Sequence, residues 1–327
     1  MPHTRLSERK RGLRTMRVIA HMLEFLEPRI LCSVSPLRLR WPSGSSGNYD
    51  NQRPAMLIAL RVDASVPPST PAPPTYDWHT QTINGALNIW APNPSDFGAT
   101  FTVTDPAMLF GPDGVPQIEG VHQGAIADCY FLAAGGALVW SNPGRLEAMI
   151  QNDTGGGWAV SFEYWSSQAD AFVPLVIHTS DQLSASMQVV SNHEVWSLVL
   201  EKAYAAFRTW DGASSQNTLA SLGWGYAGTA LTALNDANQS QYIATMSEQD
   251  LYATLQSDLA AGEPILFHTS AAAPTMAQSH VYVITGLSTD AQGVYWVTTY
   301  NPWGFFETWR ESDLLLNSVG ALVLGTH

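Results

Sequence analysis

The 327-residue chain is poor in cysteine, in long apolar runs and, over most of its length, in positive charge. Its two cysteines, Cys32 and Cys129, cannot build a disulfide framework, and no group of Cys and His residues has the spacing of a zinc site. Apolar runs of about 18 residues are absent, so the sequence predicts no membrane-spanning helix. With 45% hydrophobic and only 13% charged residues, the chain can nevertheless bury a large core.

Positive charge is concentrated near the N-terminus. Residues 1–61 carry 11 Lys and Arg against 4 Asp and Glu, whereas residues 62–327 carry 4 against 24, and the whole chain has a formal net charge of -13. A body this acidic repels phosphate backbones, so we expect no nucleic-acid partner.

The basic N-terminal segment, residues 1–61, is predicted to be a targeting segment. Charged residues interrupt the apolar stretch that an ordinary signal peptide needs. Residues 26–33 (LEPRILCS) resemble the LEPR-XLL motif found near the N-terminus of many bacterial extracytoplasmic proteins, with Cys32 where a second Leu is usual. The resemblance implies an extracytoplasmic or secreted protein, and a disordered basic arm is the alternative.

A proline-rich stretch separates this segment from the rest of the chain. Residues 62–75 contain five Pro and favour an extended polyproline conformation, so we interpret them as a linker. The predicted compact domain then covers residues 76–327. Its first part, residues 76–105, has two interpretations: a propeptide, or the first layer of the domain.

Hydrophobic periodicity divides the domain into a helical first half and a strand-rich second half. Helices are predicted at residues 129–140, 192–208 and 247–261. The second has a capping-box pair, Ser191 and Glu194, and the third begins at Ser247. Inside the first, Gly135 and Gly136 cost about 1 kcal/mol each relative to Ala, which indicates close packing of that helix. Strands are predicted at 158–164, 172–177, 264–268, 280–287, 294–300 and 319–324. This order favours an α+β domain with two lobes.

Cys129 is the only cysteine of the predicted domain and stands where a helix begins. Unpaired backbone N–H groups and the positive end of the helix dipole favour a thiolate there and lower the pKa of the thiol. Gln123 lies six residues earlier, so its amide and the backbone N–H of Cys129 could stabilise an oxyanion together. Gly124 would let this loop approach a substrate closely. The alternative is a structural cysteine, because Cys is among the most buried residue types.

A general base is predicted at His280, where a strand begins. If this strand and the next form a hairpin in which Leu287 opposes Val294, His280 directly opposes Asn301 on the same face. The Asn amide oxygen would then fix the imidazole tautomer and leave the other ring nitrogen for the thiol. A one-residue slip would separate the two side chains, and a satisfied core histidine is the alternative.

Four short motifs occur in order between residues 106 and 313. They resemble the motifs of calpain-type cysteine proteases: residues 123–134 (QGAIADCYFLAA), residues 200–205 (LEKAYA), His280 with Tyr282, and residues 301–304 (NPWG). The resemblance implies a papain-like fold with the Cys on a helical lobe and the His and Asn on a β-rich lobe. It also implies hydrolysis of peptide bonds, and hence a protein or peptide substrate.

The same resemblance implies a role for each site residue. Cys129 would be the nucleophile and His280 the base. Asn301 would orient the base, Gln123 would donate to the oxyanion, and Trp303 would shield the contact between His280 and Asn301 from water.

The chain also departs from the family at several positions. Ala127, Tyr130 and Ser279 stand where the family usually has Gly, Trp and Gly. Glu307 falls where one calcium-ligating Glu would lie, but the other ligands find no match and no EF-hand loop occurs. We therefore expect that the protein requires no cofactor and depends weakly or not at all on calcium. We also expect a monomer.

Two other functions use the same residues. A Cys-His-Asn site can transfer an acyl group to an amine, as in transglutaminases, or the fold can serve as a non-catalytic, surface-associated binding module. The Gln123 oxyanion donor, and Asn301 in place of an Asp, favour the protease.

Overall fold

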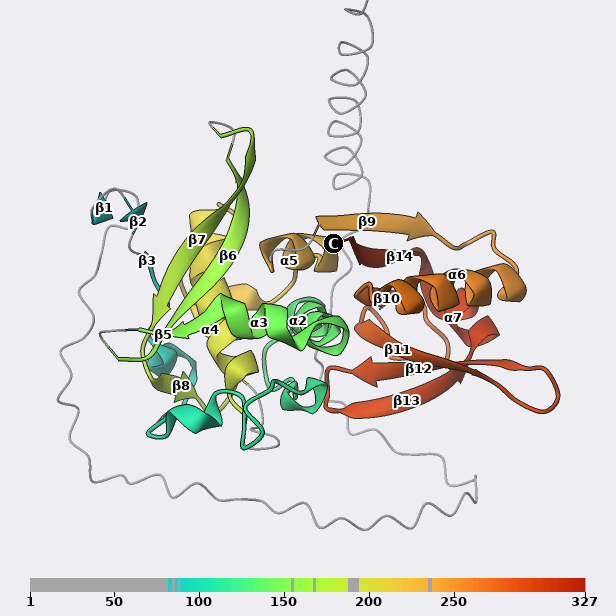
Figure 1. Ribbon diagram of the computed structural model, residues 1–327, viewed down its shortest axis with the longest axis horizontal. Coiled ribbons are helices and arrows are strands. Elements are labelled where there is room, and N and C mark those ends of the chain that lie inside the picture. Colours follow the sequence, from blue (N-terminus) through green and yellow to red (C-terminus); the bar gives the residue numbers. More distant parts are fainter. Residues whose placement is uncertain are drawn as a thin grey trace, which may run out of the picture.

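The computed structural model describes residues 82–83, 86–87, 89–153, 156–166, 169–187, 194–234 and 237–326. The predicted targeting segment and linker lie outside these residues. The described chain forms a helix-rich lobe and a β-rich lobe, which lie side by side in Figure 1. This arrangement confirms the predicted α+β, two-lobed fold.

The helix-rich lobe packs its helices against a four-stranded sheet. The helices are α2 (Cys129–Ser141), α3 (Pro143–Met149), α4 (Trp196–Trp210) and α5 (Ala227–Ala233). The sheet has the order β3-β7-β6-β5 and consists of β3 (Ile89–Trp90), β5 (Ile150–Asn152), β6 (Trp158–Ser166) and β7 (Ala171–Thr179). β3 runs parallel to β7, and the other pairs are antiparallel.

The chain joins the helix-rich lobe at Ile89. Ile89 is buried in the main core, and the short strand β4 (Thr100–Thr102) pairs with β8 (Gln182–Ser184). A separate hairpin, β1 (Thr82–Ile83) with β2 (Ala86–Leu87), precedes them. The described part of the segment 76–105 therefore includes strands that pair with the helix-rich lobe.

The β-rich lobe is built on a six-stranded antiparallel sheet of order β13-β12-β11-β10-β14-β9. Its strands are β9 (Ala237–Tyr242), β10 (Ile265–Thr269), β11 (Val281–Thr289), β12 (Tyr295–Asn301), β13 (Phe305–Arg310) and β14 (Ser318–Thr326). Alternate residues of β11 serve two cores: Val281 and Val283 join the core of the helical lobe, whereas Tyr282 and Ile284 pack with α6 (Glu248–Ala261) and α7 (Glu311–Asn317).

Helix α2 lies between the two lobes, in the centre of Figure 1. Eleven of its 13 residues are buried, so it has no solvent face. Its two glycines face both lobes: a Cβ on Gly135 would lie 3.4 Å from Leu200 of α4, and one on Gly136 would lie 3.6 Å from Val283 of β11, which are ordinary contact distances. The predicted close packing around this helix is confirmed.

The two other predicted helices differ in how well their starts were predicted. Helix α6 begins directly after Ser247, whose side chain accepts from the backbone N–H of Asp250, so its N-cap is confirmed. Helix α4 begins at Trp196 rather than at 192, and the predicted capping box is wrong. Glu194 instead accepts from the backbone N–H of Gln117 and from the indole N–H of Trp196; Ser191 lies outside the described residues.

Candidate active site

Cys129 is the first residue of α2 and is completely buried. The loop before it is tied to both lobes: the backbone N–H of Gln123 donates to Pro302 O at 2.7 Å, and that of Gly124 donates to Met187 O at 2.8 Å. The chain around Cys129 is thus fixed by contacts with the segment that follows β12. Two regions that lie far apart in the sequence therefore meet at Gln123, six residues before Cys129.

The hairpin that carries His280 has a different register from the predicted one. Leu287 opposes Val297 rather than Val294, because the strands extend further and the turn is shorter. The carboxylate of Asp290 organises this turn by accepting from the backbone N–H groups of Gln292 and Val294.

An irregularity in the hairpin nevertheless brings His280 and Asn301 together. The register shifts by one residue between Ile284 and Gly286, so that Val283 opposes Tyr300. This shift makes the total offset from the predicted register even, and an even offset keeps side chains on the same face. His280 therefore lies diagonally from Asn301 rather than directly opposite, and its Nε2 is 2.9 Å from Asn301 Oδ1.

The neighbours of Asn301 fix the orientation of its amide. Its Oδ1 accepts from the backbone N–H of Trp303 at 3.0 Å, and its Nδ2 donates to Glu307 Oε2 at 3.0 Å. Because the oxygen faces His280, the Nε2 of that imidazole must carry the proton. The arrangement leaves Nδ1 as the unprotonated nitrogen of the neutral ring.

Two aromatic rings enclose His280. Tyr282 meets it edge-on with ring centroids 5.0 Å apart, and Trp303 lies over it at 4.6 Å. His280 is 5% exposed and Asn301 1%, whereas Trp303 is 43% exposed and forms the solvent side of the cluster. Burial lowers the pKa of His280 to about 4, although the hydrogen bond to Asn301 acts in the opposite direction. This shift favours the neutral imidazole.

Gln123 is buried beside Asp128, the residue before Cys129, with its amide partly engaged. Its Nε2 donates to Ile126 O at 2.7 Å and approaches Asp128 Oδ1 at 3.4 Å. The second contact is long for an N–H···O bond, so one amide hydrogen is only weakly held. That hydrogen is available to a stronger acceptor, such as an oxyanion.

Gly124 is required for a reason that the sequence did not reveal. A Cβ at this position would lie 2.3 Å from Met187 O, so only glycine allows the loop to pair with the backbone there. The predicted reason, close approach of a substrate, is not needed to explain this glycine.

One carboxylate oxygen of Glu307, the residue considered as a calcium ligand, is engaged in a hydrogen bond. The carboxylate accepts from an amide N–H of Asn301, and a hydrogen-bond donor at that position would repel a cation. Among the residues that the structure describes, no three His, Cys, Asp or Glu side chains come together in a way that could hold a metal ion.

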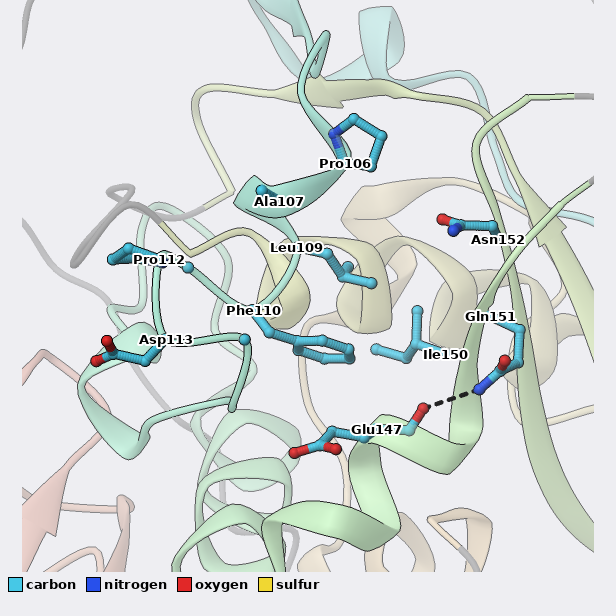
Figure 2. Close-up of a pocket in the computed structure, with 12 residues that line it drawn as sticks. Pro106, Ala107, Leu109, Phe110, Pro112, Asp113, Glu147, Ile150, Gln151 and Asn152 are labelled. Atoms are coloured by element: carbon cyan, nitrogen blue, oxygen red, sulfur yellow. Dashed lines mark hydrogen bonds between the residues drawn. The ribbon is translucent and has the colours of Figure 1, made fainter.

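A pocket of 460 Å³ lies in the helical lobe, apart from these residues (Figure 2). Its walls come from the loop that contains Phe110 and from the end of α3 with β5, where Ile150 lies. Cys129, His280 and Asn301 do not line it, so it plays no part in the geometry described above.

Comparison with known proteins agrees with this geometry. Residues 100–312 match the model of the calpain family cysteine proteases. The chain belongs to the calpain family. It is 25% identical to human calpain-9 over 241 residues, and 26% identical to rat calpain-13 over 229 residues. These matches cover 67% and 62% of the chain but only 33% and 32% of the relatives, so the chain spans about a third of their length.

The departures from the usual calpain residues can now be located. Ser279, where the family usually has Gly, adopts the left-handed conformation with φ of 49°, which a glycine adopts without strain. The hydroxyl of Tyr130, which replaces Trp, donates to Leu222 O at 3.0 Å and accepts from Arg208 Nη1. Ala127 contributes only its carbonyl, which accepts from the backbone N–H of Trp224. Tyr130 and Ala127 thus have hydrogen-bond partners in the folded chain, and Ser279 occupies a conformation that favours glycine.

The contact between Glu307 and Asn301 was not predicted from the sequence, where the resemblance to calpains assigns Glu307 only a calcium-binding role. A signal was present in the sequence. β12 and β13 form a tight hairpin around residues 301–304, so a residue six positions after Asn301 falls on the neighbouring strand.

Proposed function

We propose that this calpain-family chain is a cysteine endopeptidase that cleaves protein or peptide substrates. The observation that carries the proposal is the hydrogen bond from His280 Nε2 to Asn301 Oδ1, in a cluster where the amide orientation is fixed. Together with a buried cysteine at a helix start, this is the donor and acceptor set of a thiol hydrolase.

The proposed reaction uses Cys129 as nucleophile, His280 as general base and acid, and two N–H groups as oxyanion donors. His280 Nδ1 takes the proton of the Cys129 thiol as its sulfur attacks the substrate carbonyl carbon. The backbone N–H of Cys129 and the weakly held amide hydrogen of Gln123 stabilise the oxyanion. His280 then gives the proton to the leaving amine, and an acyl-enzyme forms. Water deprotonated by His280 releases the acid and restores the thiol.

Cleavage of a casein substrate by the purified chain is the direct test. A fluorescent amine added to the same reaction separates hydrolysis from acyl transfer: new amino termini support the endopeptidase, whereas incorporation of the amine into substrate supports a transglutaminase-like activity. Absence of both activities, with slow thiol labelling at mildly acidic pH, would indicate an unactivated cysteine and a binding module.

Calcium is expected to have little effect on this activity. Glu307 accepts from Asn301, and it belongs to no group of three or more His, Cys, Asp or Glu side chains that could hold a metal ion among the described residues. Cleavage rates with a chelator and with added calcium should agree within about twofold, a difference of less than about 0.5 kcal/mol in barrier height. A large loss with chelator that calcium restores would contradict this prediction.

Glu307 is expected to support turnover by holding Asn301. Replacing it by Ala leaves the buried Nδ2 of Asn301 without an acceptor and allows the amide to turn its nitrogen toward His280. We expect kcat to fall by roughly tenfold, the equivalent of about 1.4 kcal/mol. Glu307→Gln keeps an acceptor oxygen and should recover most of this loss; equal kcat values for the Ala variant and the unmodified protein would contradict the role.

The cellular setting is part of the same proposal. The LEPR-type motif supports an extracytoplasmic or secreted location, and we propose that the chain acts as a monomer without a nucleic-acid partner. In the described part of the chain, every helix is too short or too polar to span a bilayer.

A further inference from the structure

Asp128 stands at the N-cap of α2 but does not cap it. An Asp at this position normally accepts from a backbone N–H of the first turn, yet its side chain makes no such bond. The carboxyl group is completely buried and is directed instead toward Gln123, whose Nε2 lies 3.4 Å from its Oδ1. A residue adjacent to Cys129 thus keeps a carboxyl group inside the protein without the usual reason for one.

A second buried carboxyl group meets it from α4. Glu201 is also completely buried, and its carboxyl group is close enough to that of Asp128 to affect its pKa. The Oδ2 atom of Asp128 is buried and accepts no hydrogen bond from the described residues. Two ionised carboxylates have only acceptor atoms, so a hydrogen bond between them requires a proton on one of them. Like charges this close also repel strongly in a buried site, which favours the state with one shared proton.

Two basic groups of α4 lie near the pair, and both donate to other acceptors. The positive charge of Arg208, a residue of α4, favours the ionised form of Asp128. Its Nη1, however, donates to Tyr130 OH and Ser221 O. Lys202 follows Glu201 in the chain, yet its ammonium donates to Ser180 and to Gln182 O.

We infer that Asp128 and Glu201 share one proton and that this singly protonated pair positions Gln123 and the start of α2 for catalysis. The inference rests on the proposed peptidase function and extends it to two positioning residues. Asp128 precedes the backbone N–H of Cys129, and its Oδ1 contacts the amide of Gln123, so it adjoins both proposed oxyanion donors.

Loss of the shared proton would disturb the site in two ways. Repulsion between the two carboxylates would push Asp128 away from Glu201 and so displace the backbone at Cys129. The additional negative charge would also oppose formation of the thiolate. Activity should therefore fall as the pair ionises fully at alkaline pH.

The direction of the ionisation equilibrium agrees with this geometry. Burial raises the pKa of Asp128 to about 7, the largest effect on that group. The folded protein thus holds a proton that the unfolded chain releases near its ordinary pKa of about 4. By linkage, the stabilisation from this group is fully present below about pH 4 and is lost as pH rises through the folded-state value.

The first experiment measures the alkaline limb of kcat/KM for the unmodified protein, Glu201→Gln and Asp128→Asn. Either amide can donate to the remaining carboxylate, so the contact survives without a titrating proton. We expect the limb of both variants to move to higher pH, so that their kcat/KM relative to the unmodified protein rises by up to about tenfold per pH unit above neutrality. An unshifted limb in the folded variants would overturn the inference.

Glu194→Gln is the matched control. Glu194 is buried before α4 and also has its pKa raised to about 7 by burial, but its carboxylate accepts from N–H groups of Gln117 and Trp196. This variant should leave the alkaline limb where it is. A shift equal to that of Glu201→Gln would show that any buried carboxyl group has this effect, and would overturn the specific role of the pair.

The second experiment does not depend on activity. Between about pH 4 and pH 7, the unfolding equilibrium constant of the unmodified protein should rise with pH by up to about tenfold per unit more steeply than that of Glu201→Gln. If no peptidase activity is found at any pH but this difference is present, the proposed function fails and the shared proton stands. If the slopes are equal, the shared proton fails.

If neither single variant folds, the double variant Asp128→Asn/Glu201→Gln takes their place in both experiments. It buries no charge and can form an amide–amide hydrogen bond, so we expect it to fold and to show the flatter pH dependence of stability. A double variant that does not fold would mean that the two carboxyl groups serve other partners, and the inference would fall.

Discussion

Replacing Cys129 by Ser is expected to abolish nearly all cleavage of casein while leaving the fold intact. The serine hydroxyl is close in size to the thiol but stays protonated where the thiol ionises, and a neutral hydroxyl is a poor nucleophile. Loss of a nucleophile in such a triad lowers kcat by roughly 10⁴-fold or more. Activity assays on the purified variant, beside its melting temperature, measure both effects.

The chain supplies a simple control for this experiment. Cys32 is the only other cysteine, and it lies outside the predicted protease domain. A protein lacking Cys32 should therefore keep full activity, and Cys129→Ser in that background should lose all thiol labelling. Substantial cleavage by this double variant would remove Cys129 from the proposed mechanism.

Fold and site differ in how far the sequence predicted them. The start of α2 at Cys129 was predictable, because an apolar run with two glycines indicates a helix packed on several sides. The N-cap Ser247 was predictable for the same kind of local reason. The start of α4 was not, because Glu194 bonds to the distant backbone of Gln117, and a contact over 77 residues leaves no local pattern.

The contact between His280 and Asn301 was expected from the wrong register. The turn around Asp290 and the register shift after Ile284 each changed the strand pairing, and neither feature is specified by alternation of apolar residues. Period-two alternation fixes which face a side chain occupies but not which residue it opposes. His280 and Asn301 still lie on the same face because the two changes together shift the register by an even number of residues.

The contact between the two buried carboxyl groups could not be predicted from the sequence at all. Asp128 and Glu201 both lie within motifs that identified the family, yet nothing in either motif indicates that the two side chains meet. Their contact depends on how α4 packs against the start of α2, and packing between distant helices is a property of the folded protein.

Asn301→Ala is expected to lower kcat by roughly 10–100-fold, which is less than the loss in Cys129→Ser. A general base contributes about 10²–10⁴-fold, and removal of Asn301 takes away only the tautomer and orientation of that base, not the imidazole itself. His280 keeps its place because its backbone N–H donates to Thr269 Oγ1 and its ring packs against Tyr282 and Trp303. The measurement is kcat with one peptide substrate, together with the melting temperature on the same preparation.

Asn317→Ala separates this role from a structural one. Asn317 is equally buried in the same lobe, and its Oδ1 accepts from the backbone N–H groups of Thr275 and Met276, so its loss should lower the melting temperature. We expect Asn301→Ala to change turnover more than melting temperature and Asn317→Ala to do the reverse. If Asn301→Ala instead lowers only the melting temperature, Asn301 merely ends β12 before the turn at Pro302, and the orienting role proposed for it is wrong, since a neutral imidazole without a fixed tautomer cannot keep full turnover.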